Sequence, residues 1–300
     1  MSIDLGSPAL EVAIGLAFVF FLLSLIVSAG TEAVAWVLKW RAKTLVTGVE
    51  RLLGDEQVSS AVLSHPLVQS DVTTPVGKHR PSYVSSRNFA LALIQILRKE
   101  GKAAEGALNQ VESGIDGLCA SSPLGTQLRA LLEEADTSMV RFRASAERWF
   151  DDGMDRVSGW YKRKSQLVTI AIAVVVAIGL NASAVRIAER LITEPTVRAA
   201  VVSKAEKASL EPSEEEGTGG SLTAAGKQAE GAAKEIDSLE LPILWSAAND
   251  PFSSWDAGLV AAAGWLITVI AISLGAPFWF DALGKLAHLR TSGKKPETGK

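Results

Sequence analysis

The chain has 300 residues, of which 48% are hydrophobic, with a mean hydropathy of +0.21 and a formal net charge of −3. This hydropathy is high for two ordinary soluble domains, and the apolar residues are concentrated in three blocks. A single cysteine, Cys119, excludes an internal disulfide framework and a multi-cysteine metal site. The composition therefore predicts an all-α integral membrane protein with three transmembrane helices and a cytoplasmic helical domain.

The first apolar block, residues 12–30, is uncharged over a length that approaches the bilayer core of about 30 Å at about 1.5 Å per residue. A cleaved signal peptide is the competing interpretation, because small residues near its end resemble a cleavage site. Acidic Asp4 and Glu11 precede the block, which favours a retained anchor. We predict a short extracytoplasmic N-terminus, 1–11, and a transmembrane helix over 12–38.

The other two apolar blocks predict the remaining spans. Residues 167–180 reach a spanning length only when they are extended past Asn181, which predicts a transmembrane helix over 166–187. A buried core helix is the alternative, and it is disfavoured because the block is apolar on all sides. Residues 257–280 are uncharged and predict the third transmembrane helix, which Pro277 kinks or ends.

Basic residues orient the three predicted spans. They follow the first block, precede the second and follow the third: Lys39, Arg41, Lys43, Arg156, Lys162, Arg163, Lys164, Lys285, Arg290, Lys294 and Lys295. The positive-inside rule then places the N-terminus outside and the C-terminus inside. We predict an acidic extracytoplasmic loop over 188–256, with a short helix from Pro195 to about Leu210, a disordered Gly-rich linker, 211–226, and a cytoplasmic tail, 281–300.

Residues 39–165 are predicted to form the cytoplasmic helical domain, because their apolar spacing is helical. The clearest helix begins after Ser85 or Ser86, either of which can cap it. A weaker helix, interrupted by three glycines, covers 102–118. Residues 127–165 contain no proline, which permits one long helix that runs directly into the second span.

The end of this long helix is predicted to be amphipathic and juxtamembrane. Charged side chains occupy one arc, and an apolar, aromatic face occupies the other. A partner protein, lipid headgroups or the continuation of the first span would each be adequate to cover that face. We predict it as a partner or lipid surface formed by Trp149, Phe150, Met154, Val157, Trp160 and Tyr161.

Small and polar residues in the apolar blocks suggest further sites. A stripe at four-residue spacing predicts a helix-packing face in the second block: Thr169, Ala173, Ala177 and Asn181. Gly264 and Thr268 offer a weaker stripe in the third block. Glu32 and Asp281 are candidate polar membrane sites.

No reactive constellation is present in the sequence. There is no phosphate-binding loop or nucleophile motif, and the three histidines are too scattered for a zinc signature. Asp151, Asp152 and Asp155 form the best carboxylate cluster, but Arg148 and Arg156 each stand four residues from Asp152 and favour ion pairing over metal binding. We predict no enzymatic activity, no catalytic, cofactor or metal site, and no nucleic-acid partner.

Three stretches resemble a family of uncharacterised bacterial multi-span inner-membrane proteins: LEVAIGLAFVFFLLSLIVSAGTEAVAWVLKWRAKTLVTGVERLLGD, WFDDGMDRVSGWYKRKSQ and SLGAPFWFDALGKL. The chain departs from that pattern at Gly153, where the family often has threonine, and this affects local helix stiffness. The resemblance implies a bacterial cytoplasmic membrane and this architecture, and it carries no catalytic residue.

The features together predict a non-enzymatic membrane anchor or scaffold that presents the cytoplasmic helical domain to partner proteins. An oligomeric channel or pore-forming subunit is the alternative. The expected partners are the lipid bilayer and either other proteins or further copies of the chain.

Overall fold

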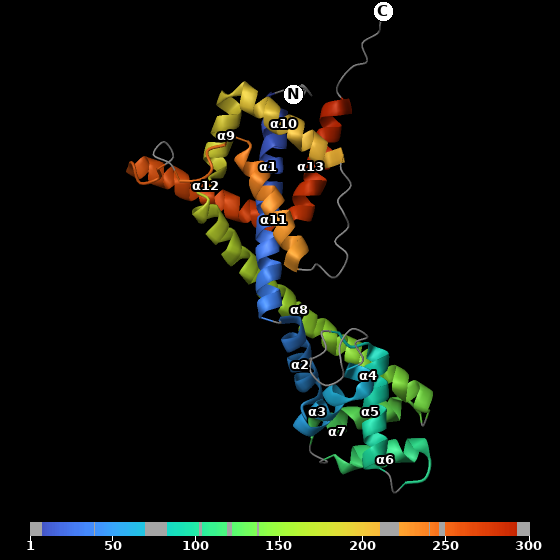
Figure 1. Cartoon of the computed structure of the whole chain (residues 1–300). Helices are drawn as coiled ribbons and strands as arrows, with labels where there is room; N and C mark the ends of the chain where they lie inside the picture. The colour runs from blue at the N-terminus through green and yellow to red at the C-terminus, as the bar shows by residue number, and fades with distance from the viewer. Residues whose placement is uncertain are drawn as a thin grey trace, which may run out of the picture. The chain divides into compact units, whose positions relative to one another are not determined.

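The computed structural model describes residues 8–38, 40–69, 83–101, 104–118, 122–136, 138–210, 222–239, 241–245 and 250–292. It is 86% helical, with no strand in these ranges, so the all-α prediction is confirmed. The chain divides into two compact units (Figure 1). Unit 1 comprises Met1–Val37 and Ser165–Lys300, and unit 2 comprises Leu38–Lys164.

Thirteen helices are described. In chain order they are α1 (Pro8–Val37), α2 (Trp40–Leu53), α3 (Glu56–Ser64), α4 (Pro66–Gln69), α5 (Ser86–Glu100), α6 (Ala107–Gly117), α7 (Pro123–Glu134), α8 (Met139–Gly179), α9 (Ala184–Thr193), α10 (Pro195–Leu210), α11 (Leu222–Asp237), α12 (Trp255–Ser273) and α13 (Ala276–Ser292).

Unit 2 contains α2 to α7 and the first part of α8 around one apolar core. Three of its helices begin at capping side chains: Asp55, Ser85 and Ser122 accept hydrogen bonds from backbone N–H groups at the starts of α3, α5 and α7. Phe89 of α5 stacks on Phe150 of α8 with ring centroids 4.2 Å apart, and both side chains are buried. The core of unit 2 is therefore built between α5 and α8.

The weak helix predicted over 102–118 is α6, and its central glycine has a packing role. A Cβ atom at Gly114 would overlap the carbonyl oxygen of Leu97 on α5. A Cβ atom at Gly101 would likewise overlap the carbonyl oxygen of Gln110 on α6. The two backbones approach too closely for any side chain at these positions. The glycines that lower helix propensity are therefore the residues that let α5 and α6 meet.

Helix α8 extends from unit 2 into unit 1 without interruption. It begins at Met139, later than the predicted long helix, because α7 ends at Glu134 and the chain turns through Asp136, whose φ is 47°. A positive φ is incompatible with helix continuation.

Helix α1 is the centre of unit 1, where α9, α10, α11, α12 and α13 all contact it (Figure 1). The large buried side chains of the core include Ile14, Phe18 and Leu23 of α1. Among the described residues, α1 and α12 are long and apolar enough to cross a membrane, and α8 with α9 forms a third candidate if this bent pair is one span. By length and composition, two or three helical elements could thus cross a membrane.

Each of the second and third predicted spans, 166–187 and 257–280, contains a break between two helices. Helix α8 ends at Gly179, Asn181 has a φ of 48°, and α9 continues at 51° to α8. Helix α12 ends at Ser273, and Gly275 turns the chain with a φ of 89°. A left-handed residue interrupts the helix in each case, and glycine and asparagine tolerate this conformation best.

The predicted loop 188–256 contains ordered helices. Helix α10 runs from Pro195 to Leu210, as expected. Residues 222–226, predicted as part of the disordered linker, instead begin α11, while residues 211–221 lie outside the described ranges. Helix α11 buries an alanine-rich face against α1, which explains why a weakly apolar segment is helical.

The predicted cytoplasmic tail, 281–300, is also helical over most of its length. Residues up to Ser292 belong to α13, which contacts α1 and α10. The side chain of Leu283 is fully buried in the core of unit 1. Because apolar residues of α13 pack on α1, residues 281–292 are part of the fold of unit 1.

Candidate functional site

The aromatic face at the end of the amphipathic segment of α8 is largely internal to unit 2. Of the residues predicted as a partner or lipid surface, Phe150 and Val157 are buried within unit 2. A Cβ atom at Gly48 of α2 would lie 2.8 Å from Val157, which shows that α2 covers this face. The sequence left three possible covers for this face. The one observed is α2, the segment that follows the first predicted span.

The other members of the face lie nearer its edge. Trp149 is half-buried with its ring centroid 6.2 Å from that of Phe89, and Met154 and Tyr161 are also half-buried. Trp160 is 47% exposed, and the guanidinium carbon of Arg51 lies 4.9 Å from its ring centroid. Such a cation–π contact leaves the opposite side of the indole available.

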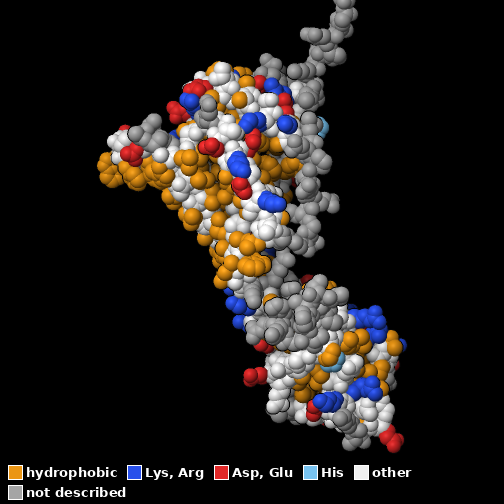
Figure 2. Space-filling view, in the orientation of Figure 1, with side chains coloured by type: hydrophobic (Ala, Val, Ile, Leu, Met, Phe, Trp, Pro, Cys, Tyr) orange, Lys and Arg blue, Asp and Glu red, His pale blue; other side chains and the backbone are white. Residues whose placement is uncertain are grey.

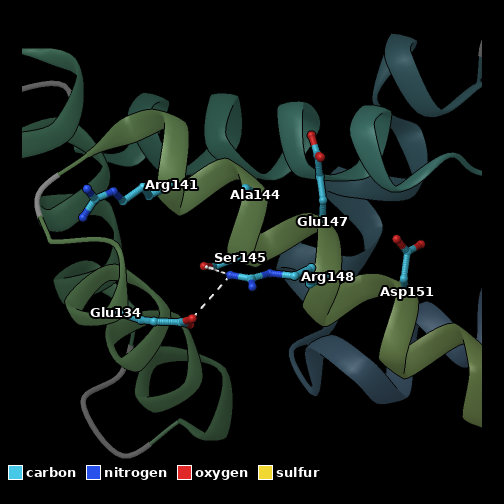
Figure 3. Close-up of a pocket in the computed structure, with 7 residues that line it drawn as sticks. All are labelled: Glu134, Arg141, Ala144, Ser145, Glu147, Arg148 and Asp151. Carbon is cyan, nitrogen blue, oxygen red and sulfur yellow. Dashed lines mark hydrogen bonds and ion pairs between the residues drawn. The ribbon is translucent and has the colours of Figure 1, made fainter.

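A pocket of about 550 Å³ opens on unit 2 between α7 and the first part of α8 (Figure 3). Most of its lining is charged or polar: Glu134, Arg141, Ala144, Ser145, Glu147, Arg148 and Asp151. Figure 3 shows Arg148 reaching across the pocket, where its Nη2 lies 3.3 Å from Oε1 of Glu134 and 3.0 Å from Oγ of Ser145. Arg148 therefore pairs across to α7 and not with Asp152 on its own helix.

The predicted stripe of small residues on α8 lies in the interior of unit 1. Ala173 and Ala177 are fully buried, and Oγ1 of Thr169 is 3.4 Å from Oγ1 of Thr31 on α1. A Cβ atom at Gly30 would approach Ile172 to 3.2 Å. These residues hold α8 close to α1, the geometry that small side chains permit between apolar helices.

Asn181 terminates the stripe in a different way from that expected. It lies in the break between α8 and α9 and so is not on a helix face, although its side chain is fully buried. Its Oδ1 accepts a hydrogen bond of 3.2 Å from Nε1 of Trp265 on α12. At the break, Asn181 therefore makes a polar contact with α12 and does not continue the packing face of α8.

Other groups satisfy the backbone at the break. The carbonyl oxygen of Leu180 accepts from the N–H of Leu244 at 2.6 Å, and that of Gly179 accepts from Nε1 of Trp245 at 3.1 Å. The N–H of Ala184 donates to Oγ1 of Thr268 at 3.0 Å. An interrupted helix in an apolar surrounding needs such partners, because no water is available to its free carbonyl and amide groups.

Ser183 packs directly on α12 beside this contact. A Cβ atom at Gly264 would overlap Oγ of Ser183, so Gly264 is required for the close approach of α9 and α12. The hydroxyl of Ser183 is buried and makes no hydrogen bond to any residue that the structure describes. The weak stripe predicted at Gly264 and Thr268 therefore faces the start of α9.

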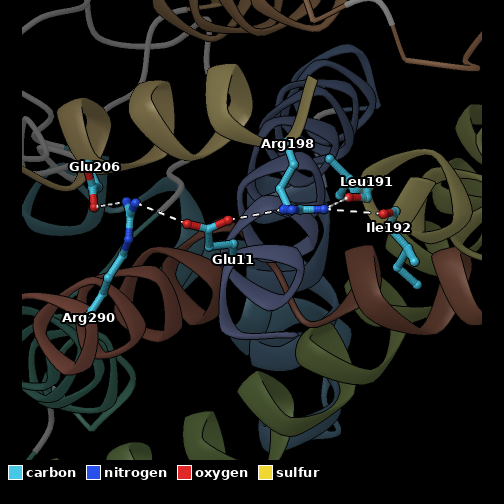
Figure 4. A network of polar contacts seen from close by, with 6 residues as sticks. All are labelled: Glu11, Leu191, Ile192, Arg198, Glu206 and Arg290. Atoms are coloured by element: carbon cyan, nitrogen blue, oxygen red, sulfur yellow. Dashed lines mark hydrogen bonds and ion pairs between the residues drawn. The ribbon is translucent and has the colours of Figure 1, made fainter. Parts of the chain in front are cut away.

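A network of charged side chains joins three helices of unit 1 (Figure 4). Oε2 of Glu11 on α1 lies 3.1 Å from Nε of Arg198 on α10, and Oε1 lies 3.2 Å from Nη2 of Arg290 on α13. Arg290 also pairs with Glu206 of α10 at 2.5 Å. Arg198 donates to the carbonyl oxygens of Leu191 and Ile192 at the end of α9. Glu11 is the central acceptor of this network.

The sequence analysis considered Glu11 and Arg290 separately, as flanking charges of the predicted spans, and did not find their association with Arg198. No local pattern could have found it, because the three residues are separated by 187 and 279 positions. The low exposure of the side chains, 24% for Glu11 and 11% for Arg198, is a property of the assembled unit.

The two candidate polar membrane sites, Glu32 and Asp281, are exposed on α1 and α13. Asp151, Asp152 and Asp155 are exposed on α8. Across the described ranges, no group of three or more histidine, cysteine or acidic side chains is arranged to hold a metal ion. His79 and Cys119 lie outside those ranges.

Comparison with known proteins found no matching family model, no similar curated protein and no similar solved structure.

Proposed function

We propose that the protein is a non-enzymatic membrane anchor or scaffold, in which unit 1 is held in a bacterial cytoplasmic membrane and presents unit 2 to partner proteins on the cytoplasmic side. The observation that supports this most is the division of the chain into one unit with extensive exposed apolar helices and another with a closed core and a charged surface. The uninterrupted helix α8 belongs to both.

The exposed apolar surface of unit 1 has the character of a lipid contact. Figure 2 shows hydrophobic side chains gathered over the second part of α8 and over α12. The large exposed members are Leu167, Ile170, Val174, Val175, Ile178, Leu259, Val260, Leu266, Ile267 and Ile270. Soluble proteins rarely expose so many contiguous apolar residues, whereas acyl chains cover them without cost.

The surface of unit 2 offers a different kind of contact. Its exposed large hydrophobic side chains in the described ranges are few: Leu38, Tyr83, Val140 and Trp160. The charged pocket between α7 and α8 combines Arg141 and Arg148 with three carboxylates. A partner with its own mixed charges would form salt-dependent contacts there, as is common at the polar rims of transient interfaces.

Site-specific photo-crosslinking in native membranes tests this function. A photo-reactive residue in place of the exposed Ala144 in the pocket should crosslink to a distinct second protein, and the double substitution R141E/R148E should abolish that product. The same residue in place of Lys43, on α2, is the control and should not give that product. Crosslinks exclusively to further copies of the chain, or products unaffected by R141E/R148E, would contradict a scaffold that recruits through this pocket.

The contacts of α13 favour an orientation in which the start of α1 and the end of α13 lie on the same, outer side. Oγ of Ser24 donates to the carbonyl oxygen of Ile272 at 3.3 Å, near the turn between α12 and α13. From there α13 runs antiparallel to α1 as far as the contact of Arg290 with Glu11. This differs from the C-terminus inside that the basic residues alone predicted.

Aromatic contacts hold the first turns of α13 against the middle of α1. The rings of Phe20 and Trp279 are 4.9 Å apart, and those of Phe21 and Phe280 are 5.9 Å apart. The turn at Gly275 thus lies at the level of the middle of α1. Irregular backbone at that depth is tolerated where protein surrounds it, as α1 does here.

Cysteine labelling decides between the two orientations. In a C119S background, single cysteines A9C on α1, T47C on α2 and S292C at the end of α13 are treated with a membrane-impermeant maleimide in right-side-out vesicles. We expect A9C and S292C to react directly and T47C only after permeabilisation. Protection of S292C together with T47C would restore the C-terminus to the inner side.

A second candidate function, an oligomeric channel or pore-forming subunit, is favoured by α11. This helix packs on α1, yet its opposite face carries exposed Lys227, Glu230 and Lys234. Charged side chains so close to the most apolar helix of the chain must face water and not acyl chains. Several copies arranged with α11 facing inward would enclose an aqueous space.

Ion flux in liposomes tests this candidate. Flux that requires a defined oligomer and changes its cation-to-anion ratio with the double substitution K227E/K234E would support it. The double substitution K207E/K285E, at exposed lysines of α10 and α13, is the control for a change of net charge. A verified oligomer without flux would eliminate the channel.

A further inference from the structure

Basic side chains are concentrated where α2 and α8 pack together in unit 2. Residues 40–53 and 156–164 contain seven Lys or Arg and one Asp or Glu, a net charge of +6, in a chain whose net charge is −3. A local charge opposite to that of the whole chain indicates a surface for an anionic partner.

The two segments form one surface because the helices are antiparallel neighbours. Nζ of Lys164 lies 4.9 Å from the ring centroid of Trp40, and Arg51 lies at the same distance from Trp160. Between these two contacts, Gly48 meets Val157. Basic residues that are over a hundred positions apart in the sequence therefore lie on adjacent helices.

Several of these basic side chains are free to bind a ligand. Lys43, Arg156, Lys162 and Arg163 are exposed, and none of them takes part in an ion pair between described residues. We call these four residues, with Arg51 and Lys164, the basic collar. The charged groups of Arg51 and Lys164 lie over the indole rings of Trp160 and Trp40. These cation–π contacts hold both charges at the surface formed by α2 and α8.

We propose that the basic collar binds the phosphate groups of anionic lipids in the leaflet that unit 1 occupies. Helix α8 runs without a break from the collar into exposed apolar residues that begin at Leu167. The five steps from Lys162 to Leu167 rise about 7.5 Å at about 1.5 Å per residue. Lys162, Arg163 and Lys164 therefore fall within a headgroup region of about 5–8 Å per leaflet.

The arrangement favours lipid over a soluble phosphate compound. The collar extends along two helices, and none of its six residues lines the pocket between α7 and α8. Trp160, at 47% exposure, lies among the basic residues. Amphipathic indole rings beside Lys and Arg are typical of the membrane interface, where they contact the headgroups and the upper acyl chains together.

The inference rests on the proposed insertion of unit 1 in a membrane, and native mass spectrometry of the full chain tests it. The protein is reconstituted in nanodiscs that contain equal amounts of phosphatidylcholine and phosphatidylglycerol, and the lipids retained on release are counted. We expect phosphatidylglycerol to be retained in preference to phosphatidylcholine. The double substitution K162Q/R163Q should lower that preference about fivefold for each basic residue removed.

The matched control is R98Q/K99Q, an adjacent and exposed arginine and lysine in the last turn of α5 in the same unit. It should retain the wild-type preference. An equal loss in the control, or equal retention of the two lipids by the wild type, would overturn the proposal. Failure of the chain to resist alkaline extraction from vesicles would overturn the proposed membrane anchor as well, whereas insertion without lipid preference would overturn only the collar.

Discussion

Glu11 and Arg290 form an ion pair of 3.2 Å although 279 positions separate them in the chain. The pair joins the first turn of α1 to the last turn of α13 and continues through Arg198 and Glu206 of α10. These side chains are 11–36% exposed, so their charges are only partly solvated. Removal of one side chain from such a partly buried network leaves its charged partners without hydrogen bonds, so the stability of the network depends on every member.

We expect E11A to lower the free energy of unfolding of the protein in detergent by about 2 kcal/mol, because Arg198 and Arg290 would both lose a charge-assisted hydrogen bond. Thermal unfolding followed by circular dichroism measures the effect. A double-mutant cycle with R290Q should give a clear coupling energy between the two positions. Additive effects would show that the pair contributes nothing specific.

The contact between α5 and α6 predicts that G114A is strongly destabilising. The new Cβ atom would overlap the carbonyl oxygen of Leu97, a backbone atom that cannot turn aside. We expect a loss of about 1–3 kcal/mol, measured as the unfolding of unit 2. The control G117A, on the same helix with no atom within 4 Å of the added Cβ, should be neutral or stabilising. Similar losses for both variants would refute the packing role.

Gly153 is a milder case, because the atom that a Cβ would meet belongs to a side chain. The approach is 2.7 Å to Cδ1 of Leu52, which can change rotamer. We expect G153T to lower the free energy of unfolding by about 1 kcal/mol, and L52A in the same chain to reduce this added cost. G159A, with no atom within 4 Å, is the control and should be neutral or stabilising. The absence of coupling between positions 52 and 153 would contradict the close approach of α2 and α8.

Asn181 combines a left-handed backbone with a hydrogen bond to Trp265, and two variants separate these contributions. N181G keeps the conformation but leaves Nε1 of Trp265 without this acceptor, at a cost of about 1–3 kcal/mol. N181A should cost about 1 kcal/mol more, because alanine tolerates a positive φ poorly. Thermal unfolding in detergent checks the order. Equal stability of the two variants would remove the role of the backbone.

The surface of α11 gives a prediction about pH. The hydrogen bond from Lys234, and then its charge, lower the pKa of Glu230, which is fully exposed. A depressed carboxyl pKa stabilises the folded state above the unfolded pKa, and this contribution is lost as the pH falls through the folded value. NMR titration of K234Q should return the pKa of Glu230 toward its ordinary value. An unchanged pKa would mean that Lys234 does not cause the shift.

The sequence alone determined the features that depend on neighbours along the chain. Hydropathy marked α1, α12 and the apolar end of α8, and local capping chemistry marked Ser85 as the start of α5. The start of α10 at Pro195 followed from the fixed φ of proline. Each of these depends on residues within a few turns, so the linear pattern was sufficient.

Only the tertiary structure decided which surfaces are covered. The sequence left the cover of the amphipathic face of α8 open, because α2 is about a hundred residues away in the chain. The glycines of α6 appeared only as residues that weaken a helix, because their partner is the distant backbone of α5. The turn at Gly275 and the pairing of Arg290 with Glu11 place α13 along α1, where the sequence predicted a tail. The effect of a charged residue or a glycine on its own helix can be predicted from the sequence. Its distant partner cannot, because only the packing of the helices determines which residues meet.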